Sequence, residues 1–270
     1  MAEIVPLGQL AGVVPDPALW TAVIPAAGRG SRLGSAAPKL LYPLLGRPIL
    51  DWLLDAVRPS CRRLVFVLAP AQVDVVRPLL ERRLGGEVAV VLQESPLGMG
   101  DAVRLAAPRV TTPHTLVVWG DQATLRATTV AACAAWHERR PGAALTLPTV
   151  LREEPYIHLE RDREGRLLRV LQAREGEIHQ AVGENDCGLF LFRTALLFSL
   201  LEAARVEGGA TGAGTREFNL LQVLPRFETG PGAVGTVRIE DVEETQGVNT
   251  PQDACLVEGI LRRRGVTGHP

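Results

Sequence analysis

The segment VIPAAGRGSRLGSAAPK, residues 23–39, joins an apolar run to a glycine-rich loop that carries three cations. The apolar run predicts a buried strand, and the small residues after it predict a loop without bulky side chains. Such residues let backbone N–H groups approach an oxyanion closely, while arginine and lysine add positive charge. The loop matches neither the Walker spacing nor G-x-G-x-x-G. The segment therefore predicts a strand followed by a phosphate-binding loop of another kind.

The composition restricts what that anion can be. The 270 residues carry a net charge of −1, and aromatic residues make up 4%. A nucleic-acid surface needs a basic field and stacking aromatics, so we expect no nucleic-acid partner. We also expect no membrane partner, because no apolar run approaches ~18 residues. The N-terminus lacks a basic secretory signal and the four cysteines are scattered, which is typical of a cytoplasmic protein.

Apolar strands alternate with helical patterns over the first 150 residues. The alternation predicts a doubly wound α/β sheet with right-handed crossovers. Ligands in such a sheet bind at the carboxyl ends of the strands, which is where the loop after residue 25 lies. We expect strands over 19–26, 63–69, 87–93, 114–121 and 143–150, and helices over 48–57, 70–84, 100–108 and 127–140.

The pattern changes after residue 150. Residues 151–184 alternate in polarity and contain a D-R-E-G turn, which predicts an antiparallel insertion. A core strand over 185–192, a helix over 194–204, a mobile glycine-rich loop over 206–215 and a closing helix over 251–264 are expected next. We find no repeat or linker, so residues 1–270 are expected to form a single domain.

The motif P-A-A-G-R-G-S-R-L-G…P-K…G-R-P resembles the signature of nucleotidyltransferases that activate sugar 1-phosphates. Among these are the bacterial N-acetylglucosamine-1-phosphate and glucose-1-phosphate uridylyl- and thymidylyltransferases. The resemblance continues in order through four later motifs and covers roughly residues 20 to 262. These motifs are Q-E-S-P-L-G-M-G (93–100), V-V-W-G-D (117–121), N-D-C-G-L-F-L-F (185–192) and Q-G-V-N-T-P-Q-D (246–253).

The resemblance implies a Rossmann-like α/β/α sandwich with a mostly parallel mixed sheet and an inserted antiparallel part. It also implies a reaction in which a sugar phosphate attacks the α-phosphorus of a nucleoside triphosphate and pyrophosphate leaves. Catalysis then consists of positioning and charge neutralisation. The chain ends without the β-helix domain that some relatives carry, so we expect no fused acetyltransferase. The sequence leaves a homo-oligomer open.

Four polar residues are expected to form the catalytic centre. Arg32 would hold the leaving pyrophosphate, with Arg29 as a weaker candidate, and Lys39 would stabilise the attacked phosphate. Lys39 is the only lysine of the chain, which favours a specific role over a solvated surface position. Asp121 follows an apolar strand and would bind Mg²⁺, although an aspartate there is as often a turn or cap residue. The resemblance alone implies Asn249 as the second metal ligand.

The resemblance also distributes the remaining site residues. The nucleotide would contact the start of the phosphate loop and, through its base, the third strand end, where a glutamine amide can read a pyrimidine. The residues concerned are Ala26, Ala27, Gly28, Gly30, Gln93 and Gly98. Met99 stands where relatives usually carry threonine, which leaves the identity of the base open.

The expected acceptor pocket departs from the relatives. Y-I-H-L at 156–159, which begins with Tyr156, replaces Y-G-R-I, Gln172 replaces a glutamate, and Asp186 replaces an asparagine. Glu217, in an E-F-N segment, resembles another sugar-side position. An amide and a carboxylate accept and donate hydrogen bonds differently, so these departures favour an unusual sugar or sugar-like (cyclitol) phosphate, or a non-sugar phosphate or phosphonate.

Three alternatives remain open at this point. A cytidylyltransferase acting on an alcohol phosphate or phosphonate would share the opening motif. A glycosyltransferase of the same architecture would need a D-x-D-like motif, whereas the chain has W-G-D-Q. A catalytically silent binding module would be expected to have lost at least one of Arg32, Lys39, Asp121 and Asn249.

Overall fold

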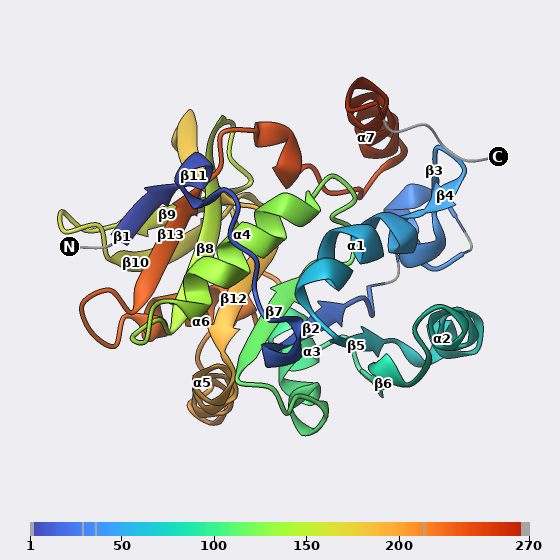
Figure 1. The fold of residues 1–270 in the computed structure, drawn as a ribbon, viewed down its shortest axis with the longest axis horizontal. Coiled ribbons are helices and arrows are strands. Elements are labelled where there is room, and N and C mark those ends of the chain that lie inside the picture. The colour runs from blue at the N-terminus through green and yellow to red at the C-terminus, as the bar shows by residue number, and fades with distance from the viewer. Residues whose placement is uncertain (1–2, 29, 36, 213, 266–270) are drawn as a thin grey trace.

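A computed structural model of the chain describes residues 3–28, 30–35, 37–212 and 214–265. Its centre is a nine-stranded sheet in the order β1-β13-β8-β12-β7-β2-β5-β6, with β11 paired to β8 (Figure 1). β12 runs antiparallel to both neighbours and β11 antiparallel to β8, while the other pairs are parallel. The strands of this sheet are β1 (Glu3–Pro6), β2 (Trp20–Pro25), β5 (Arg63–Leu68), β6 (Val88–Leu92), β7 (His114–Val118), β8 (Leu145–Glu153), β11 (Val182–Asp186), β12 (Leu189–Arg193) and β13 (Val234–Arg238). This mixed, mostly parallel sheet confirms the predicted fold class.

Helices cover both faces of the sheet, as a strand that is apolar on both faces requires. Trp20, Ala22 and Ile24 of β2 pack in one core with α1, α2 and α4, whereas Val23 packs in another with α3, α5 and α6. Figure 1 shows α1 and α4 lying in front of the strands. The helices are α1 (Ile49–Val57), α2 (Pro70–Leu84), α3 (Met99–Leu105), α4 (Ala127–Glu138), α5 (Thr194–Val206), α6 (Leu220–Val223) and α7 (Pro251–Arg263).

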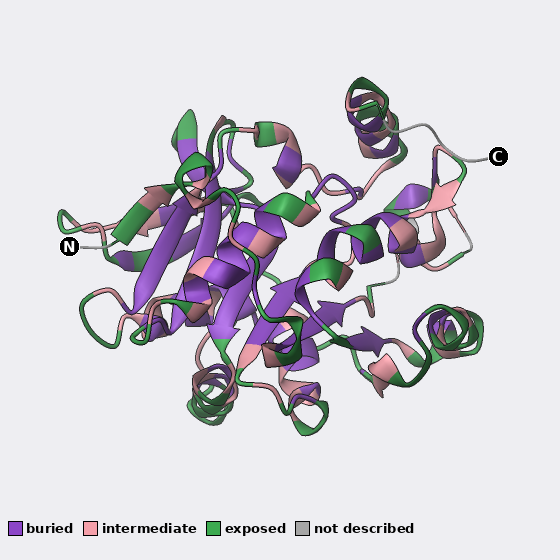
Figure 2. Ribbon diagram, viewed as in Figure 1, coloured by how far each residue is buried: buried purple, intermediate pink, exposed green. Residues whose placement is uncertain are grey.

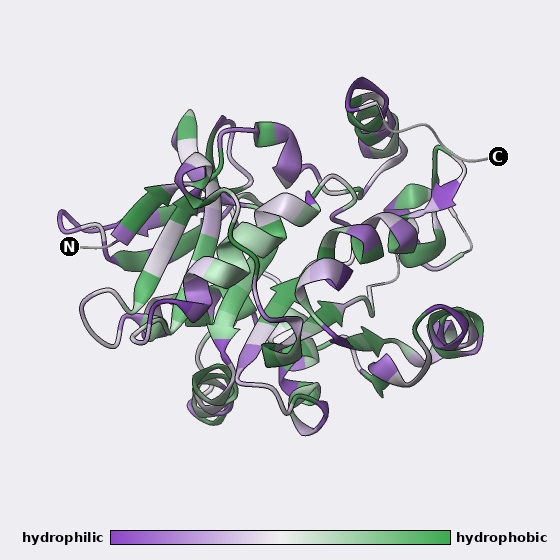
Figure 3. Ribbon diagram, in the orientation of Figure 1, coloured by the Kyte–Doolittle hydropathy of each residue, from purple (hydrophilic) through white to green (hydrophobic). Residues whose placement is uncertain are grey.

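The burial and hydropathy of the chain follow this layering. The central strands are buried, while the outer sides of α2, α5 and α7 are exposed (Figure 2). Figure 3 shows the same strands as the hydrophobic centre of the molecule. A third, smaller core joins α7 to the start of α1 and to the phosphate loop, through Leu33, Trp52 and Val257. This core fixes the carboxyl-end loops relative to one another.

Two small antiparallel sheets flank the main one. β3 (Pro43–Leu44) and β4 (Arg47–Pro48) form a hairpin after the phosphate loop. β9 (Ile157–Arg161) pairs with β10 (Leu167–Gln172), and this pair packs on the core of α6 through Leu159 and Val170. The chain then returns along β8 as β11.

The strand predicted over residues 185–192 is wrong as a single element. β11 ends at Asp186 and β12 begins at Leu189, because Gly188 between them has φ +66°, a left-handed conformation that breaks a strand. Among the described strands, β11 pairs with β8 alone, whereas β12 pairs with β7 and β8. The break places Asp186 at the end of a strand rather than inside one.

Candidate active site

The backbone leaving β2 turns at once into the predicted phosphate loop. The N–H of Ala26 donates to the carbonyl of Val67 at 2.8 Å, which keeps the strand end beside β5. The side-chain amide of Gln72 donates to the carbonyl of Gly28 at 3.1 Å. Ala27 follows Ala26 and is half-buried, whereas Gly28 is exposed. Small residues on a backbone held in this way leave room for an anion.

The loop folds back on itself at Gly30. This residue has φ +62°, and a Cβ placed on it would lie 3.1 Å from the Cβ of Lys39. A short 3₁₀ helix, Ser31–Leu33, follows, and a second one begins at Lys39. Glycine is therefore needed where the two arms of the loop approach each other. Arg29 lies outside the described residues.

Lys39, Asp121 and Asn249 meet at the carboxyl edge of the sheet. The ammonium Nζ of Lys39 donates to Oδ2 of Asp121 at 2.7 Å and to Oδ1 of Asn249 at 2.9 Å. The side chains of Lys39 and Asp121 are 19% and 15% exposed, so the pair is sheltered but reachable. Two residues that are distant in the sequence, Asp121 and Asn249, thus accept hydrogen bonds from the same ammonium group, that of Lys39.

The segments that carry Asp121 and Asn249 are joined by their backbones. The N–H of Val248 donates to the carbonyl of Asp121 at 3.2 Å. A Cβ on Gly247 would lie 3.2 Å from Cγ of Asp121, so glycine permits this close approach. The N–H of Asn249 donates at 2.9 Å to Oδ2 of Asp253, the carboxylate that also accepts from Thr250 in the capping box at the start of α7. Asp253 was missed from the sequence, although T-P-Q-D is a recognisable capping-box pattern.

Arg32 lies at the exposed rim of this cluster. Its guanidinium Nη2 approaches Oδ1 of Asn249 at 3.5 Å, a long contact, and the residue is exposed. The remaining N–H groups of the guanidinium can therefore turn toward an anion. A planar fork beside a movable ammonium is suited to a chain of phosphates.

The oxygen atoms at this edge of the sheet suit a hard divalent cation. Oδ2 of Asp121 and Oδ1 of Asn249 converge on one cation already, the ammonium of Lys39. Oδ1 of Asp121 is buried, and none of the described residues hydrogen bonds to it. A buried carboxylate oxygen without a partner is costly unless a ligand or ion completes it. Carboxylate and amide oxygens in small number are typical of a magnesium site shared with phosphates.

Gln93 and Gly98 shape the loop that follows β6. The side-chain Nε2 of Gln93 donates to the carbonyl of Gly98 and to Oδ2 of Asp101, both at 3.0 Å. Both amide protons are thus used within the loop, and only the carbonyl of Gln93 is left for a base. Gly98 has φ +105°, and a Cβ on it would lie 2.5 Å from the carbonyl oxygen of Phe218. The loop is therefore held against residues 217–218.

Gln172 and Glu217 lie on two segments that are joined by hydrogen bonds. Gln172 is buried, and its Oε1 accepts a hydrogen bond of 2.9 Å from Nδ2 of Asn219. None of the described residues accepts a hydrogen bond from its Nε2, which is also buried. Glu217 accepts from Arg174 at 3.2 Å. Asn219 was missed, and its place beside Glu217 in the E-F-N segment was the available signal.

Asp186 is a buried carboxyl group with one free oxygen. Its Oδ1 accepts from the N–H of Gly188 at 2.6 Å, and none of the described residues donates to its buried Oδ2. Burial raises the pKa of the Asp186 carboxyl to about 6, and the nearby charge of Asp121 adds to this rise. Asp186 therefore lies close enough to Asp121 to be affected by its charge.

Tyr156 differs from the other predicted acceptor residues because it is 53% exposed. Ile157, which follows it, is buried, and its N–H donates to Oδ1 of Asn185 at 2.9 Å. The start of β9 is thus anchored next to Asp186, while the ring of Tyr156 is free to pack on a ligand.

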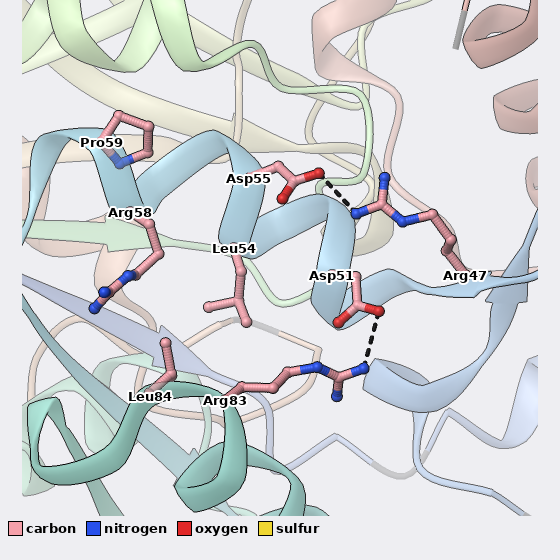
Figure 4. A pocket seen from close by; sticks show the side chains of 8 residues that line it. All are labelled: Arg47, Asp51, Leu54, Asp55, Arg58, Pro59, Arg83 and Leu84. Carbon is pink, nitrogen blue, oxygen red and sulfur yellow. Dashed lines mark hydrogen bonds and ion pairs between the residues drawn. The ribbon is translucent and has the colours of Figure 1, made fainter. Parts of the chain in front are cut away.

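A pocket of about 560 Å³ between α1 and the end of α2 does not include these residues (Figure 4). Each of its three arginines is paired with a carboxylate, although Glu87, the partner of Arg58 at 2.6 Å, does not line the pocket. Arg47 pairs with Asp55 at 2.7 Å and Arg83 pairs with Asp51 at 3.0 Å. These pairs leave the pocket without a free charge that would select an anion, so the carboxyl edge of the sheet is the better candidate.

Comparison with known proteins identifies the family of the chain. It belongs to the MobA-like NTP transferase domain family, whose sequence profile matches residues 22–211, more than half of the chain. The bifunctional protein GlmU of Pelobacter propionicus is 32% identical over 249 residues, which are 90% of this chain and 52% of that protein. GlmU of Pelotomaculum thermopropionicum is 31% identical over 248 residues, with the same two coverages. The chain spans about half the length of these curated relatives.

Solved structures show the same fold. The inositol-1-phosphate CTP transferase of T. maritima superposes with a TM-score of 0.65 at 19% identity, covering 92% of this chain and 97% of that one. The 4-diphosphocytidyl-2C-methyl-D-erythritol synthase of Anaerococcus prevotii gives the same TM-score at 15% identity, covering 92% and 100%. The sequence profile and the GlmU relatives confirm the nucleotidyltransferase family inferred from the motifs, and the solved structures confirm its fold. No helix among the described residues is long and apolar enough to cross a membrane.

Proposed function

We propose that the chain transfers a nucleoside monophosphate from a nucleoside triphosphate to a sugar 1-phosphate or a sugar-like, cyclitol phosphate. An oxygen of the acceptor phosphate attacks the α-phosphorus and forms a new P–O bond. The bond between the α-phosphorus and the bridging oxygen breaks, and pyrophosphate leaves with that electron pair. The products are a diphosphate-linked nucleotide and pyrophosphate.

The observation that carries this proposal is the convergence of Lys39, Asp121 and Asn249 beside a loop of small residues. Two polyanions must meet for this reaction, so the site has to supply positive charge in a fixed place. Lys39 would neutralise charge on the attacked phosphate, and Arg32 would hold the departing pyrophosphate. The alanines and glycines at 26–30 would let the triphosphate lie against the backbone.

We propose Mg²⁺ as the cofactor, held by Asp121 and Asn249. The free, buried Oδ1 of Asp121 and the hard oxygens of both residues support this assignment. Bound there, the ion would draw charge from the phosphate oxygens and align the two substrates. The side-chain oxygens of Asp121 and Asn249 are kept near each other by the backbone hydrogen bond from the N–H of Val248 to the carbonyl of Asp121.

The acceptor is proposed to lie between Gln172 and Asp186. None of the described residues hydrogen bonds to Nε2 of Gln172, a donor, or to Oδ2 of Asp186, an acceptor when ionised. A polyhydroxylated phosphate offers hydroxyl groups that satisfy both, which an apolar alcohol phosphate does not. Tyr156 and Glu217 would flank this pocket. The inositol-1-phosphate CTP transferase among the fold relatives makes a cyclitol phosphate a reasonable acceptor.

A cytidylyltransferase acting on an alcohol phosphate or phosphonate is the second candidate. The fold is shared with 4-diphosphocytidyl-2C-methyl-D-erythritol synthase, which favours this candidate. The two candidates differ in the chemical groups of the acceptor that would hydrogen bond to the buried polar atoms of Gln172 and Asp186.

We place the enzyme in the cytoplasm. Cys61, Cys133 and Cys187 are buried free thiols, and Cys255 is an exposed one. Free thiols of this kind are typical of a reducing compartment.

Pyrophosphate release from UTP, dTTP, CTP, GTP and ATP, each with a panel of acceptor phosphates and Mg²⁺, tests the proposal. The panel should contain hexose 1-phosphates, inositol phosphates, and short alcohol phosphates and phosphonates. Release that requires one base and a polyhydroxylated acceptor is expected. Release with an alcohol phosphate alone would favour the second candidate. Silence with every pair, together with no thermal shift by any triphosphate, would contradict both.

A further inference from the structure

The ammonium group of Lys39 lies where the proposed metal ion would bind. The ammonium of Lys39 touches Oδ2 of Asp121 at 2.7 Å and Oδ1 of Asn249 at 2.9 Å. These are the two oxygens proposed above to hold Mg²⁺. A second cation that must touch both of them would overlap the ammonium and be repelled by it.

We propose that Lys39 is an internal counter-ion that occupies the metal position of the nucleotide-free protein and leaves it when metal and nucleotide bind. This inference rests on the proposed metal site. Lys39 would stabilise the two oxygens before substrate arrives and would then turn to the phosphates. Lys39 thus competes with free metal ions for the two oxygens and later neutralises charge on the phosphates of the bound nucleotide.

The surroundings of Lys39 allow such an exchange. Its ammonium makes hydrogen bonds to no described residue other than Asp121 and Asn249, and its flexible stem is partly exposed. The oxygens, in contrast, are fixed. The N–H of Val248 donates a hydrogen bond to the carbonyl of Asp121, and the N–H of Asn249 donates one to the carboxylate of Asp253. The two oxygens would therefore stay in place while the cation between them changes.

Charge balance supports the same conclusion. The charge of Asp121 contributes to the raised pKa of Asp186, so the two carboxyl groups lie near each other, and each has a buried oxygen without a described partner. The ammonium is the cation in hydrogen-bond contact with Asp121. When it leaves, another cation must enter, because an uncompensated carboxylate at this depth is costly. Metal entry and lysine departure are therefore coupled, and the nucleotide favours both because it attracts Lys39.

Direct metal binding in the absence of nucleotide tests the exchange, with Mn²⁺ alone as the probe. Free Mn²⁺ is measured by electron paramagnetic resonance for the wild type, Lys39→Met and Arg32→Met. We expect Lys39→Met to bind Mn²⁺ at least about tenfold more tightly than the wild type, because the competing state is gone. Arg32→Met is the matched control, since it also loses one positive charge near Asn249 but keeps the ammonium contacts. We expect it to change the affinity by less than about threefold.

Two results would overturn the proposal. One is a gain below about threefold for Lys39→Met, which includes the case in which neither protein binds Mn²⁺. The other is an equal gain in both variants, which would mean that net charge alone controls the affinity. Lys39→Gln provides a second variant if the methionine protein is unstable. Because no turnover is measured, these outcomes are independent of whether the panel of acceptors reveals the reaction.

The single lysine of the chain permits a second measurement on the wild-type protein. Labelling with ¹³Cε-lysine gives one resonance, from Lys39. Titration with Mg²⁺ and a non-hydrolysable triphosphate together should move this resonance further than the same triphosphate alone. An identical shift with and without Mg²⁺, at saturating triphosphate, would show that the metal does not replace the ammonium.

Discussion

Gly98 provides a quantitative test of how the loop after β6 is held. Alanine at this position would have φ +105°, a conformation nearly restricted to glycine, at a cost of about 1–3 kcal/mol. Its Cβ would also lie 2.5 Å from the carbonyl oxygen of Phe218, a backbone atom that cannot rotate away. Relief of this overlap would strain the hydrogen bonds from Phe218 to Leu97 and from Gly100 to Phe218, worth about 1 kcal/mol each. The expected loss in free energy of unfolding is therefore about 3–5 kcal/mol.

Two matched glycines separate the contributions. Gly85→Ala has the strain without the overlap, because Gly85 has φ +56° and nothing lies within 4 Å of its Cβ position. Gly86→Ala has neither, so its effect should be within about 0.5 kcal/mol. Urea unfolding of the three variants gives the free energies, and the thermal shift by a nucleoside triphosphate reports the binding loop. Gly98→Ala should lose stability and nucleotide response together. If it is no less stable than Gly85→Ala, the close packing of this loop on residues 217–218 is refuted.

Three further changes have defined outcomes. Asp121→Asn would remove the anionic ligand of the proposed metal site, so turnover should fall by about 10²–10³-fold and the Mg²⁺ concentration for half-maximal rate should rise; a rate profile in Mg²⁺ identical to the wild type would exclude Asp121 from the site. Asp186→Asn keeps the size of the side chain but loses the free acceptor oxygen, so the KM for the acceptor should rise about tenfold or more while that for the triphosphate stays constant; equal changes in both constants would contradict the assignment. Burial lowers the pKa of His137 well below its usual value, and it also lowers the pKa of the adjoining His114. Each histidine is then neutral when folded but takes up a proton when unfolded below about pH 6.5, so stability is complete above that pH and falls below it by up to about 1.4 kcal/mol per pH unit for each. The raised pKa of Asp186 acts in the opposite direction, so the test is the difference in urea unfolding between wild type and His137→Gln from pH 7.5 to 5; parallel curves would refute a role for His137.

Local pattern was enough to predict the doubly wound fold. β2 is apolar on both faces and is followed by glycine and alanine, and these features need no knowledge of distant contacts. The same applies to α2 and α4, whose observed bounds match the expected helices within two residues. Local pattern failed at Gly188, where a positive φ divides the run N-D-C-G-L-F-L-F into two strands, the second of which is the apolar one. It also missed β1, because a four-residue edge strand is stabilised by its pairing with β13 rather than by its own sequence.

The candidate site divides in a similar way. The motifs suggested that Lys39, Asp121 and Asn249 belong together, and the structure places their polar atoms within hydrogen-bond distance. The use of both amide protons of Gln93 inside its own loop could not be predicted, because it depends on how residues 98–101 fold back. The bond between Gln172 and Asn219 joins residues 47 positions apart, and no spacing rule connects them. The roles of these residues in binding or catalysis remain predictions.

The proposed reaction transfers the nucleoside monophosphate group of a nucleoside triphosphate to an acceptor phosphate at the site that contains Lys39. Phosphorus-31 NMR of the reaction with the active pair of substrates, using wild type and Lys39→Met at equal concentration, tests it most directly. We expect the wild type to form a diphosphate-linked product and pyrophosphate in equal amounts, and Lys39→Met to form both at least about 10²-fold more slowly. Formation of orthophosphate and a nucleoside diphosphate, or an unchanged rate in Lys39→Met, would contradict it.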